Sequence, residues 1–463
     1  MSEGVSWSAE PLGAICEIVS GITKDAKKQG DDYREVPYLR VANVQRLRLD
    51  LSEVKTIPAK ESAIASYRLE PGDILLNEGG DRDKLGRGWI WQGQISECIH
   101  QNHVFRARIR DGKAIPKWIA YYANTNEARA YFLATGKQTT NLASISKKNL
   151  SALPIPLPPI EIQESIVVEI DTQLSRLDET VSTLQGIQDK LKQARASILK
   201  AAVEGRLTAK KSTHHLLAIS RQDNPSALRR VDGTELGGRK DANVNEAWRV
   251  LEARLACESV ESGTTPPKER LSSHNDHNKI PFIKVYNLTF DGKLDFANNQ
   301  PTYVEAEYHS TKMKRSRTLP GDVLTNIVGP PLGKVSLVSG ENAEWNINQA
   351  IARFRPTPEL MPKFLAIYLR SSTAQAWLRA TSKTTTSQVN LSISNCRLLP
   401  IPIPPLDKQQ SIIAEVDRRF SVLDQVEATV EASLQRCGIL RQAILKRAFE
   451  GRLVAHFTSP NLG

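Results

Sequence analysis

The segments LPIPLPP (residues 153–159) and LPIPIPP (residues 399–405) are two copies of one motif, 246 positions apart. The same shift aligns the downstream residues without a gap, as far as ILKAAVEGRL (198–207) and ILKRAFEGRL (444–453). Self-similarity at a fixed period is typical of a chain built from repeated structural units. The sequence therefore predicts two copies of one unit, and this repeat decides the fold class.

The agreement between the two halves is weaker upstream of the proline-rich motif. PKWIA (116–120) and PKFLA (362–366) still align at the same shift, whereas PGDIL (71–75) and PGDVL (320–324) need a slightly different one. Each half therefore consists of a head that differs between the two copies, followed by a tail that is more similar between them.

Each tail predicts one long helix that carries a coiled-coil seam. Apolar residues recur every seven positions after the proline-rich motif, and further apolar residues fill the complementary positions. Gly205 and Gly451 follow the last of them, where a helix is expected to stop. The seam residues are Ile170, Leu177, Leu184, Leu191 and Ile198 with Leu174, Val181 and Ala202 in the first tail, and Val416, Leu423, Val430, Cys437 and Ile444 with Phe420, Leu434 and Ala448 in the second.

The heads are predicted to be mixed α/β. Segments 36–44, 73–77 and 104–110 have the apolar content of strands, while 117–134 has helical spacing. A polar stretch with weak periodicity separates the halves and reads as a linker. The predicted division is a first head at 1–159, a helix at 160–207, a linker at 208–245, a second head at 246–405 and a helix at 406–453.

The composition narrows the class of protein. A chain of 463 residues exceeds what one hydrophobic core usually supports. Its 62 Lys and Arg against 51 Asp and Glu give a formal charge of +11, which favours polyanionic partners. The five cysteines are scattered without a C-x-x-C pair, so neither a disulfide framework nor a zinc site is indicated. Without a signal peptide or an apolar run of about 20 residues, we expect a cytoplasmic protein that does not enter a membrane.

The positive charge is concentrated at equivalent places in the two heads. Residues 101–150 contain nine Lys or Arg and two Asp or Glu, and residues 351–400 contain seven and one. Phosphate contacts are what two diverged nucleic-acid-binding heads would share. In the first window, Arg106, Arg108, Arg110 and Lys117 are therefore expected to contact phosphate.

Polar loops beside predicted strands are candidates for reading bases, because Arg and Lys suit guanine while Asn and Gln suit adenine. Each residue alone is more readily explained as a surface or capping group, so the prediction concerns the loops as sets. The candidates are Asn77, Arg82, Lys84, Arg87, Arg106, Arg108, Lys137 and Thr139 in the first head, and Lys284, Lys312, Lys314, Arg315, Asn348, Lys383 and Thr385 in the second.

The sequence contains none of the following catalytic or cofactor-binding motifs. GPPLGKV (329–335) is one residue too short for a phosphate-binding loop and has Val335 where magnesium would need Ser or Thr. Neither the nuclease pattern P-D…(D/E)-x-K nor the Asn/Asp-Pro-Pro-aromatic loop of adenine methyltransferases occurs. We therefore expect no catalytic residue, cofactor or metal in this chain. A cytoplasmic coiled-coil scaffold with two protein-binding heads is the alternative to a DNA-binding protein.

The doubled order of variable head, LPIPxPP, and heptad helix ending in ILKxAxEGRL resembles the specificity subunits of Type I restriction-modification complexes. The resemblance covers nearly the whole chain. It implies an α+β fold in which two target-recognition domains are separated by two long antiparallel coiled-coil helices, a tandem repeat with pseudo-two-fold symmetry. The second head opens with EAW (246–248), where family members often show a Pro-Glu-Gly-Trp-like segment.

The same resemblance implies a function without catalysis in this chain. Each head would read one half of a bipartite, asymmetric site in double-stranded DNA. Two methyltransferase subunits would dock on the chain, and the restriction subunits would join through the complex. S-adenosylmethionine, ATP and magnesium would then be used by those partner subunits.

Overall fold

The computed structural model describes residues 7–23, 32–110, 112–138, 143–207, 248–274, 278–329, 331–384 and 389–453. The chain forms two compact units. Unit 1 comprises residues 1–186 with 430–463, and unit 2 comprises residues 187–429. Each unit therefore contains one head and one half of each long helix. The predicted linker at 208–245 lies outside the described residues.

The two tails form the helices α6 (Ile160–Val203) and α12 (Leu406–Phe449), each of 44 residues. Both begin directly after the proline-rich motif, because proline lacks the N–H that a helix interior needs. Both stop at a glycine with positive φ, +72° at Gly205 and +68° at Gly451. At the first stop, the N–H of Arg206 donates to the carbonyl of Ala201, the bond that defines a Schellman cap. The predicted stops are confirmed.

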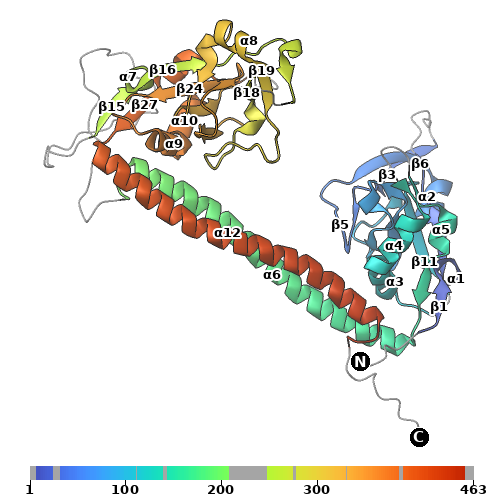
Figure 1. Cartoon of the computed structure of the whole chain (residues 1–463). Coiled ribbons are helices and arrows are strands. Elements are labelled where there is room, and N and C mark those ends of the chain that lie inside the picture. Colours follow the sequence, from blue (N-terminus) through green and yellow to red (C-terminus); the bar gives the residue numbers. More distant parts are fainter. Residues whose placement is uncertain are drawn as a thin grey trace. The chain divides into compact units, whose positions relative to one another are not determined.

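Halves of α6 and α12 lie side by side within each unit (Figure 1). In unit 1, Arg441 of α12 pairs with Asp178 of α6. In unit 2, Arg195 of α6 pairs with Asp424 of α12 at 2.5 Å. Each arginine and each aspartate lies 246 positions from its counterpart, so one interhelix contact occurs twice with the roles of the helices exchanged. That exchange is what an antiparallel, pseudo-two-fold pair requires.

The seam departs from the strict heptad at the C-terminal ends of both helices. Ile198 and Ile444 were predicted seam residues and are only half-buried, whereas their neighbours Leu199 and Leu445 are 6% and 0% exposed. An α-helix has 3.6 residues per turn, so it drifts by about 20° per heptad from a repeat of 3.5. The buried face has therefore moved on by one residue.

The first head contains two main sheets, one antiparallel throughout and one that combines a parallel and an antiparallel pair. The first has the strand order β2-β11-β7-β9 and the second β10-β3-β6. Helix α3 packs against β7 and β9. The elements are β1 (Ala9–Pro11), α1 (Leu12–Ile15), β2 (Cys16–Ser20), β3 (Tyr33–Leu39), β4 (Val44–Gln45), β5 (Arg48–Leu49), β6 (Lys55–Lys60), α2 (Glu61–Tyr67), β7 (Ile74–Asn77), β8 (Gly79–Gly80), η1 (Arg82–Lys84), β9 (Gly88–Ile90), β10 (Ile99–His100), β11 (Val104–Ile109), α3 (Pro116–Ala123), α4 (Asn126–Thr135), β12 (Lys137–Gln138), β13 (Ala143–Ser144), α5 (Lys147–Ser151) and β14 (Pro154–Pro156).

The second head repeats this arrangement. Its four-stranded sheet has the order β16-β24-β21-β22, and its five-stranded sheet has the order β17-β19-β18-β23-β20. The elements are β15 (Arg249–Glu252), α7 (Ala253–Ala256), β16 (Cys257–Ser262), η2 (Lys268–Arg270), β17 (Leu271–Ser272), β18 (Lys279–Ile283), η3 (Val285–Asn287), β19 (Thr302–Glu305), α8 (Ala306–Thr311), η4 (Lys314–Ser316), β20 (Arg317–Thr318), β21 (Val323–Asn326), β22 (Val335–Leu337), β23 (Trp345–Ile347), β24 (Ile351–Pro356), α9 (Pro362–Arg370), α10 (Ser372–Ala380), β25 (Lys383–Thr384), β26 (Val389–Asn390), α11 (Ile393–Leu398) and β27 (Pro400–Ile403).

The mixed heads, the tandem repeat and the two long helices are confirmed, while one predicted helix is divided. The segment 117–134 forms α3 and α4, which meet at a break before Asn126. Thr125 caps α4, because its Oγ1 accepts a hydrogen bond from the N–H of Ala128 at 3.1 Å. Ser371 makes the same cap for α10 in the second head.

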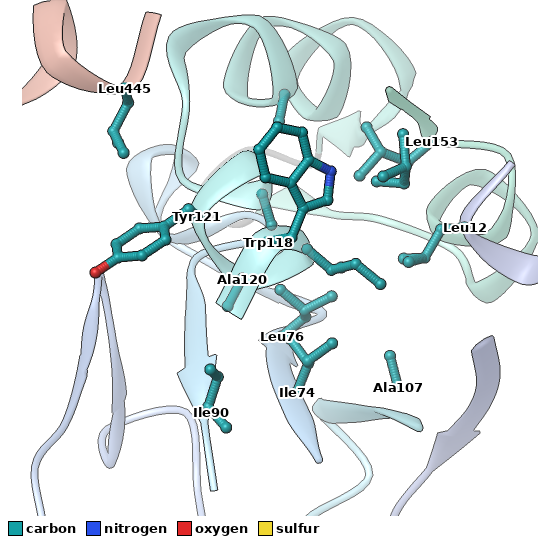
Figure 2. Packing of buried hydrophobic residues seen from close by; sticks show 14 of the residues in the cluster. Leu12, Ile74, Leu76, Ile90, Ala107, Trp118, Ala120, Tyr121, Leu153 and Leu445 are labelled. Carbon is teal, nitrogen blue, oxygen red and sulfur yellow. The ribbon is translucent and has the colours of Figure 1, made fainter. Parts of the chain in front are cut away.

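Each head is fixed to the long helices by buried contacts. Leu445 of α12 joins the cluster around Trp118 and Tyr121 (Figure 2). Trp118 also packs against Phe449 of α12, with a ring separation of 4.4 Å. On α6, the carboxylate of Asp171 accepts from Lys117 at 2.6 Å and from the hydroxyl of Tyr121. The core of unit 1 is therefore continuous from the sheet through α3 to both helices.

Candidate nucleic-acid interface

Asn77, the first residue of the predicted base-reading loop, is buried inside the head. It ends β7, is 0% exposed, and its Nδ2 donates to the carbonyl of Val44 at 2.9 Å. Its counterpart Asn326 ends β21, is 3% exposed, and its Nδ2 donates within its own loop to the carbonyl of Pro331 at 2.9 Å. These buried amides hold the start of each loop, and we withdraw Asn77 from the candidates for base contact.

The rest of this loop is brought beside a second candidate segment. Strand β13 pairs with β8 on one side and with β12 on the other. This small sheet places Lys137, in β12, near the loop that contains Arg82, and both side chains are exposed. Lys84 is half-buried and pairs with Asp81. Thr139 lies outside the described residues.

The second head has a corresponding arrangement. Val328, in the loop after β21, forms an antiparallel bridge with Asn390 of β26, which pairs with β25. Lys383 of β25 is exposed. Thr385 lies outside the described residues. In both heads, therefore, two segments far apart in sequence meet at one surface.

The loop glycine Gly86 serves the protein rather than a ligand. It has a φ of +63°, and a Cβ added there would lie 2.1 Å from Cε2 of Phe132 on α4. At Gly333, the corresponding position, the added atom would lie 2.3 Å from Oε1 of Gln375 on α10. The close approach of the loop backbone thus occurs against the neighbouring helix, which fixes each loop in place.

Three of the remaining candidates of the second head form an exposed basic segment between α8 and β20. Lys312, Lys314 and Arg315 are exposed, and Met313 between them is fully buried. The methionine therefore anchors a segment whose charged side chains face solvent. Lys284 and Asn348 are half-buried.

Arg106 and Arg108 hold the first head together from within. Arg106 is 5% exposed, and its guanidinium donates to the carbonyls of Ser66 and Arg68 at 3.2 and 3.0 Å. Desolvation by burial lowers its pKa. Arg108 forms a bidentate pair with the buried carboxylate of Asp73, at 2.7 and 2.8 Å, and this hydrogen bonding raises the pKa of Arg108.

The second head contains the same network. Arg353 is 5% exposed and donates to the carbonyl of Arg317. Arg355 forms a bidentate pair with Asp322 at 2.8 and 2.7 Å. Similar basic windows in two diverged heads therefore partly reflect a shared internal frame, by which we mean the buried network of these arginines with Asp73 in the first head and Asp322 in the second. The expectation that Arg106 and Arg108 contact phosphate is revised, because their charges are engaged inside the protein.

Lys117 also has an internal role, since it pairs with Asp171 as Lys363 pairs with Asp417. Arg110 is exposed and lines a shallow hollow with Lys147 and Lys148. Of the four expected phosphate contacts, Arg110 is therefore the one that we retain.

Replacing Arg106 with Gln is expected to destabilise the first head. The carbonyls of Ser66 and Arg68 would each lose the hydrogen bond from Arg106, although Arg108 still donates to the carbonyl of Arg68. The expected cost is about 1 to 3 kcal/mol. The salt dependence of DNA binding should stay the same at temperatures where the variant is folded. Thermal unfolding and binding at several salt concentrations measure the two effects. Arg110→Gln is the control, with little expected change in unfolding. A stable Arg106→Gln variant with a reduced salt slope would restore the phosphate role.

The sequence reasoning missed Arg46, Arg48 and Arg129, which meet Arg87 at one hollow of the first head. The alternation of Arg and Leu in QRLRL (45–49) is the signal that could have indicated a hairpin presenting both arginines on one side.

The described residues contain no helix long and apolar enough to cross a membrane. Within the same ranges, no group of three or more His, Cys, Asp or Glu side chains is placed to hold a metal ion.

Comparison with known proteins identifies the family. The sequence model of the Type I restriction modification DNA specificity domain matches residues 5–193 and again residues 246–436. The chain belongs to this family. The two matched ranges follow the internal repeat, so each half is one copy of the specificity domain.

Named relatives agree over nearly the full length. The chain is 26% identical over 457 residues to the Type I restriction enzyme EcoBI specificity subunit of Escherichia coli. This alignment covers 98% of the chain and 88% of the relative. It is 24% identical over 472 residues to the EcoKI specificity subunit of Escherichia coli strain K12, covering 98% and 91%. A solved chain described as "Structural basis underlying complex assembly and conformational transition of the type I R-M system" matches with a TM-score of 0.68 and 17% identity, covering 98% of this chain and 100% of that chain. That structure shares the fold of this specificity chain.

Proposed function

We propose that this chain is the DNA-reading specificity subunit of a cytoplasmic Type I restriction-modification complex, in which each head reads one half of a bipartite, asymmetric site in double-stranded DNA. The observation that best supports this proposal is that the two heads share an internal frame but differ in their exposed loops. Asp73 with Arg108 and Asp322 with Arg355 represent that frame. Two copies of one frame with different surfaces suit two different half-sites.

The exposed candidates have the chemistry that DNA recognition needs. Arg and Lys bind phosphate oxygens without regard to sequence, and Arg or Lys can also donate to O6 and N7 of guanine. They lie on loops held by rigid elements, which suits accurate positioning. The proposed contact residues are Arg82, Arg110 and Lys137 in the first head, with the half-buried Lys84 and Arg87 beside them, and Lys312, Lys314, Arg315 and Lys383 in the second, with Lys284 and Asn348 as half-buried members.

The long helices are the proposed docking surface for two methyltransferase subunits, through which the restriction subunits join. Val422 and Val426, one turn apart on α12, are 51% and 39% exposed, and the neighbouring Ile439 and Leu440 on the same helix are 69% and 51% exposed. Exposed apolar residues that cluster on a surface are typical of protein interfaces. We propose that S-adenosylmethionine, ATP and magnesium bind to the partner subunits, and that this chain contributes recognition alone.

Binding to duplex DNA at several salt concentrations tests the proposal. The logarithm of the binding constant should fall linearly with the logarithm of salt concentration, by about 0.9 for each phosphate contacted. Methylation mapping of the assembled complex should then reveal one bipartite, asymmetric sequence. Heads that bind proteins, as in the scaffold alternative, would give no steep salt slope and no methylated sequence.

A further inference from the structure

Arg370, the last residue of α9, contacts both the second head and a long helix. Its Nε donates to the carbonyl of Phe290 at 3.2 Å. Its Cζ lies 5.4 Å from the centre of the Phe420 ring on α12. Arg195 of α6 lies over the same ring, with its Cζ at 5.3 Å. One aromatic side chain of α12 is therefore contacted by an arginine of the head and by an arginine of the other long helix.

Arg370 packs on a turn at residues 288–294, which an antiparallel bridge between its first and last residues closes. Gly292 of this turn has a φ of +100°, and a Cβ added there would lie 2.9 Å from a terminal nitrogen of Arg370. The carbonyl of Gly292 accepts a hydrogen bond from the N–H of Leu337 in β22 at 3.0 Å. The turn is therefore attached to the main sheet of the head and leaves room for the guanidinium of Arg370.

Carboxylates of unit 2 offset the two positive charges around the ring. Burial lowers the pKa of Arg370, and Asp291 in the turn opposes this shift. Arg195 is paired with Asp424 at 2.5 Å and with Glu427 at 2.7 Å. A cation held over an aromatic ring is attracted more strongly when it is desolvated than when it is exposed. The stack on Phe420 is therefore favourable, and it joins α6, α9 and α12.

The stack attaches the second head to α12 beyond the buried core contacts. Ile412 and Val416 of α12 are buried in the core of this head. Phe420 lies one turn further along the helix, about 6 Å beyond Val416, and it is half-buried. A head attached through the core alone can tilt about that contact. An additional contact one turn further along the helix resists the tilt.

The first half of the repeat has other residues at these two positions. Asn124 corresponds to Arg370 and Leu174 to Phe420, because the members of each pair are 246 positions apart. Asn124 is buried, and its Nδ2 donates to the carbonyl of Gly88 in the first head at 2.9 Å. Asn124 carries no charge and Leu174 has no ring, so the stack belongs to the second head alone.

We propose that Arg370 is a positioning residue, which fixes the second head on the long helices and thereby restricts the gap between half-sites that the complex accepts. This inference rests on the proposed function and adds to it a residue that contacts no base. A head that tilts on the helices reaches its half-site at more than one gap. A head that the core and the stack both hold accepts one gap.

The double variant Arg370→Asn/Phe420→Leu tests the proposal, because it gives the second half the residues that the first half has at these positions. The assembled complex is supplied with duplexes that carry the mapped bipartite sequence, with the gap unchanged, one base pair longer or one base pair shorter. The initial rate of methylation is measured for each duplex. The preference for the unchanged gap should fall about fivefold, as the loss of a desolvated cation–ring contact predicts, while both half-site sequences stay the same.

Two further variants make the result specific. Phe420→Leu alone removes the ring and should give a smaller loss of the gap preference. Arg254→Asn is the control, because it removes a charge from the same head where Arg254 pairs with Glu252 at 2.6 Å, and it should leave the preference unchanged.

The outcomes separate this inference from the proposed function. A double variant that unfolds at a lower temperature but keeps the wild-type gap preference would overturn the inference, since Arg370 would then act on folding alone. A change in either half-site sequence would also overturn it, because the turn would then read bases. If the wild-type complex methylates no bipartite sequence, the proposed function itself fails.

Discussion

A fragment of residues 1–208 is expected to form a homodimer that, with methyltransferase partners, recognises an inverted repeat of the first half-site. In unit 1, residues 430–453 cover α6 and the head. Residues 184–207 are their copy in the repeat, so a second fragment can supply the same surface. The matching positions include Leu191 for Cys437, Leu199 for Leu445 and Ala202 for Ala448.

The driving force is burial of the apolar face that the fragment would otherwise expose. Leu174 and Leu177 are 5% and 8% exposed in the cluster that includes residues of α12. Exposing such surface costs about 25 cal/mol per Å². A closed pair uses one patch on both copies, and Arg195 of the second copy can replace Arg441 as the partner of Asp178. Light scattering should therefore give twice the mass of the fragment.

One position offers a matched pair of variants. Phe449 packs against Trp118 and Tyr122, at ring separations of 4.4 and 5.1 Å, and its copy in the fragment is the smaller Val203. Val203→Phe should therefore tighten the dimer, roughly tenfold for about 1.4 kcal/mol of restored aromatic packing. Leu191→Asp should produce a monomer, because it places a charge in the seam. A monomeric parent fragment, or a dimer that still requires an asymmetric site, would contradict the pseudo-two-fold arrangement.

Replacing Gln163 with Leu is expected to give the largest loss of stability in unit 1. The side chain is 0% exposed. Its Oε1 accepts from the N–H of Ile115 at 3.1 Å, and its Nε2 donates to the carbonyls of Lys113 and Pro158 at 2.9 and 2.8 Å. Leucine fills a similar volume but leaves these three backbone groups unsatisfied. The expected cost is on the order of 3 to 5 kcal/mol.

The repeat supplies the control for this variant. Gln409 is also 0% exposed and makes the same three contacts, to Met361, Glu359 and Pro404, at 2.7, 2.8 and 2.8 Å. Gln409→Leu should therefore destabilise unit 2 and leave unit 1 unchanged. Proteolysis followed by mass spectrometry can assign the unfolding of each unit. Equal destabilisation of both units by either variant would show that the two glutamines do not act locally.

The sequence by itself determined the repeat, the mixed heads, the two long helices and their ends. These features have local causes: a period in the residue pattern, prolines that exclude a helix interior, and glycines that adopt positive φ beyond Val203 and Phe449. The family resemblance was confirmed for the same reason, because the doubled tail is itself a sequence pattern.

Only the tertiary structure decided which charged residues face solvent. In the first head, Arg106, Arg108 and Lys117 have partners at sequence separations of 35 to 54 residues. Arg46, Arg87 and Arg129 converge although they come from a hairpin, a loop and a helix. An arginine has the same charge in both settings, and chain folding alone determines whether a carbonyl, a carboxylate or solvent surrounds it.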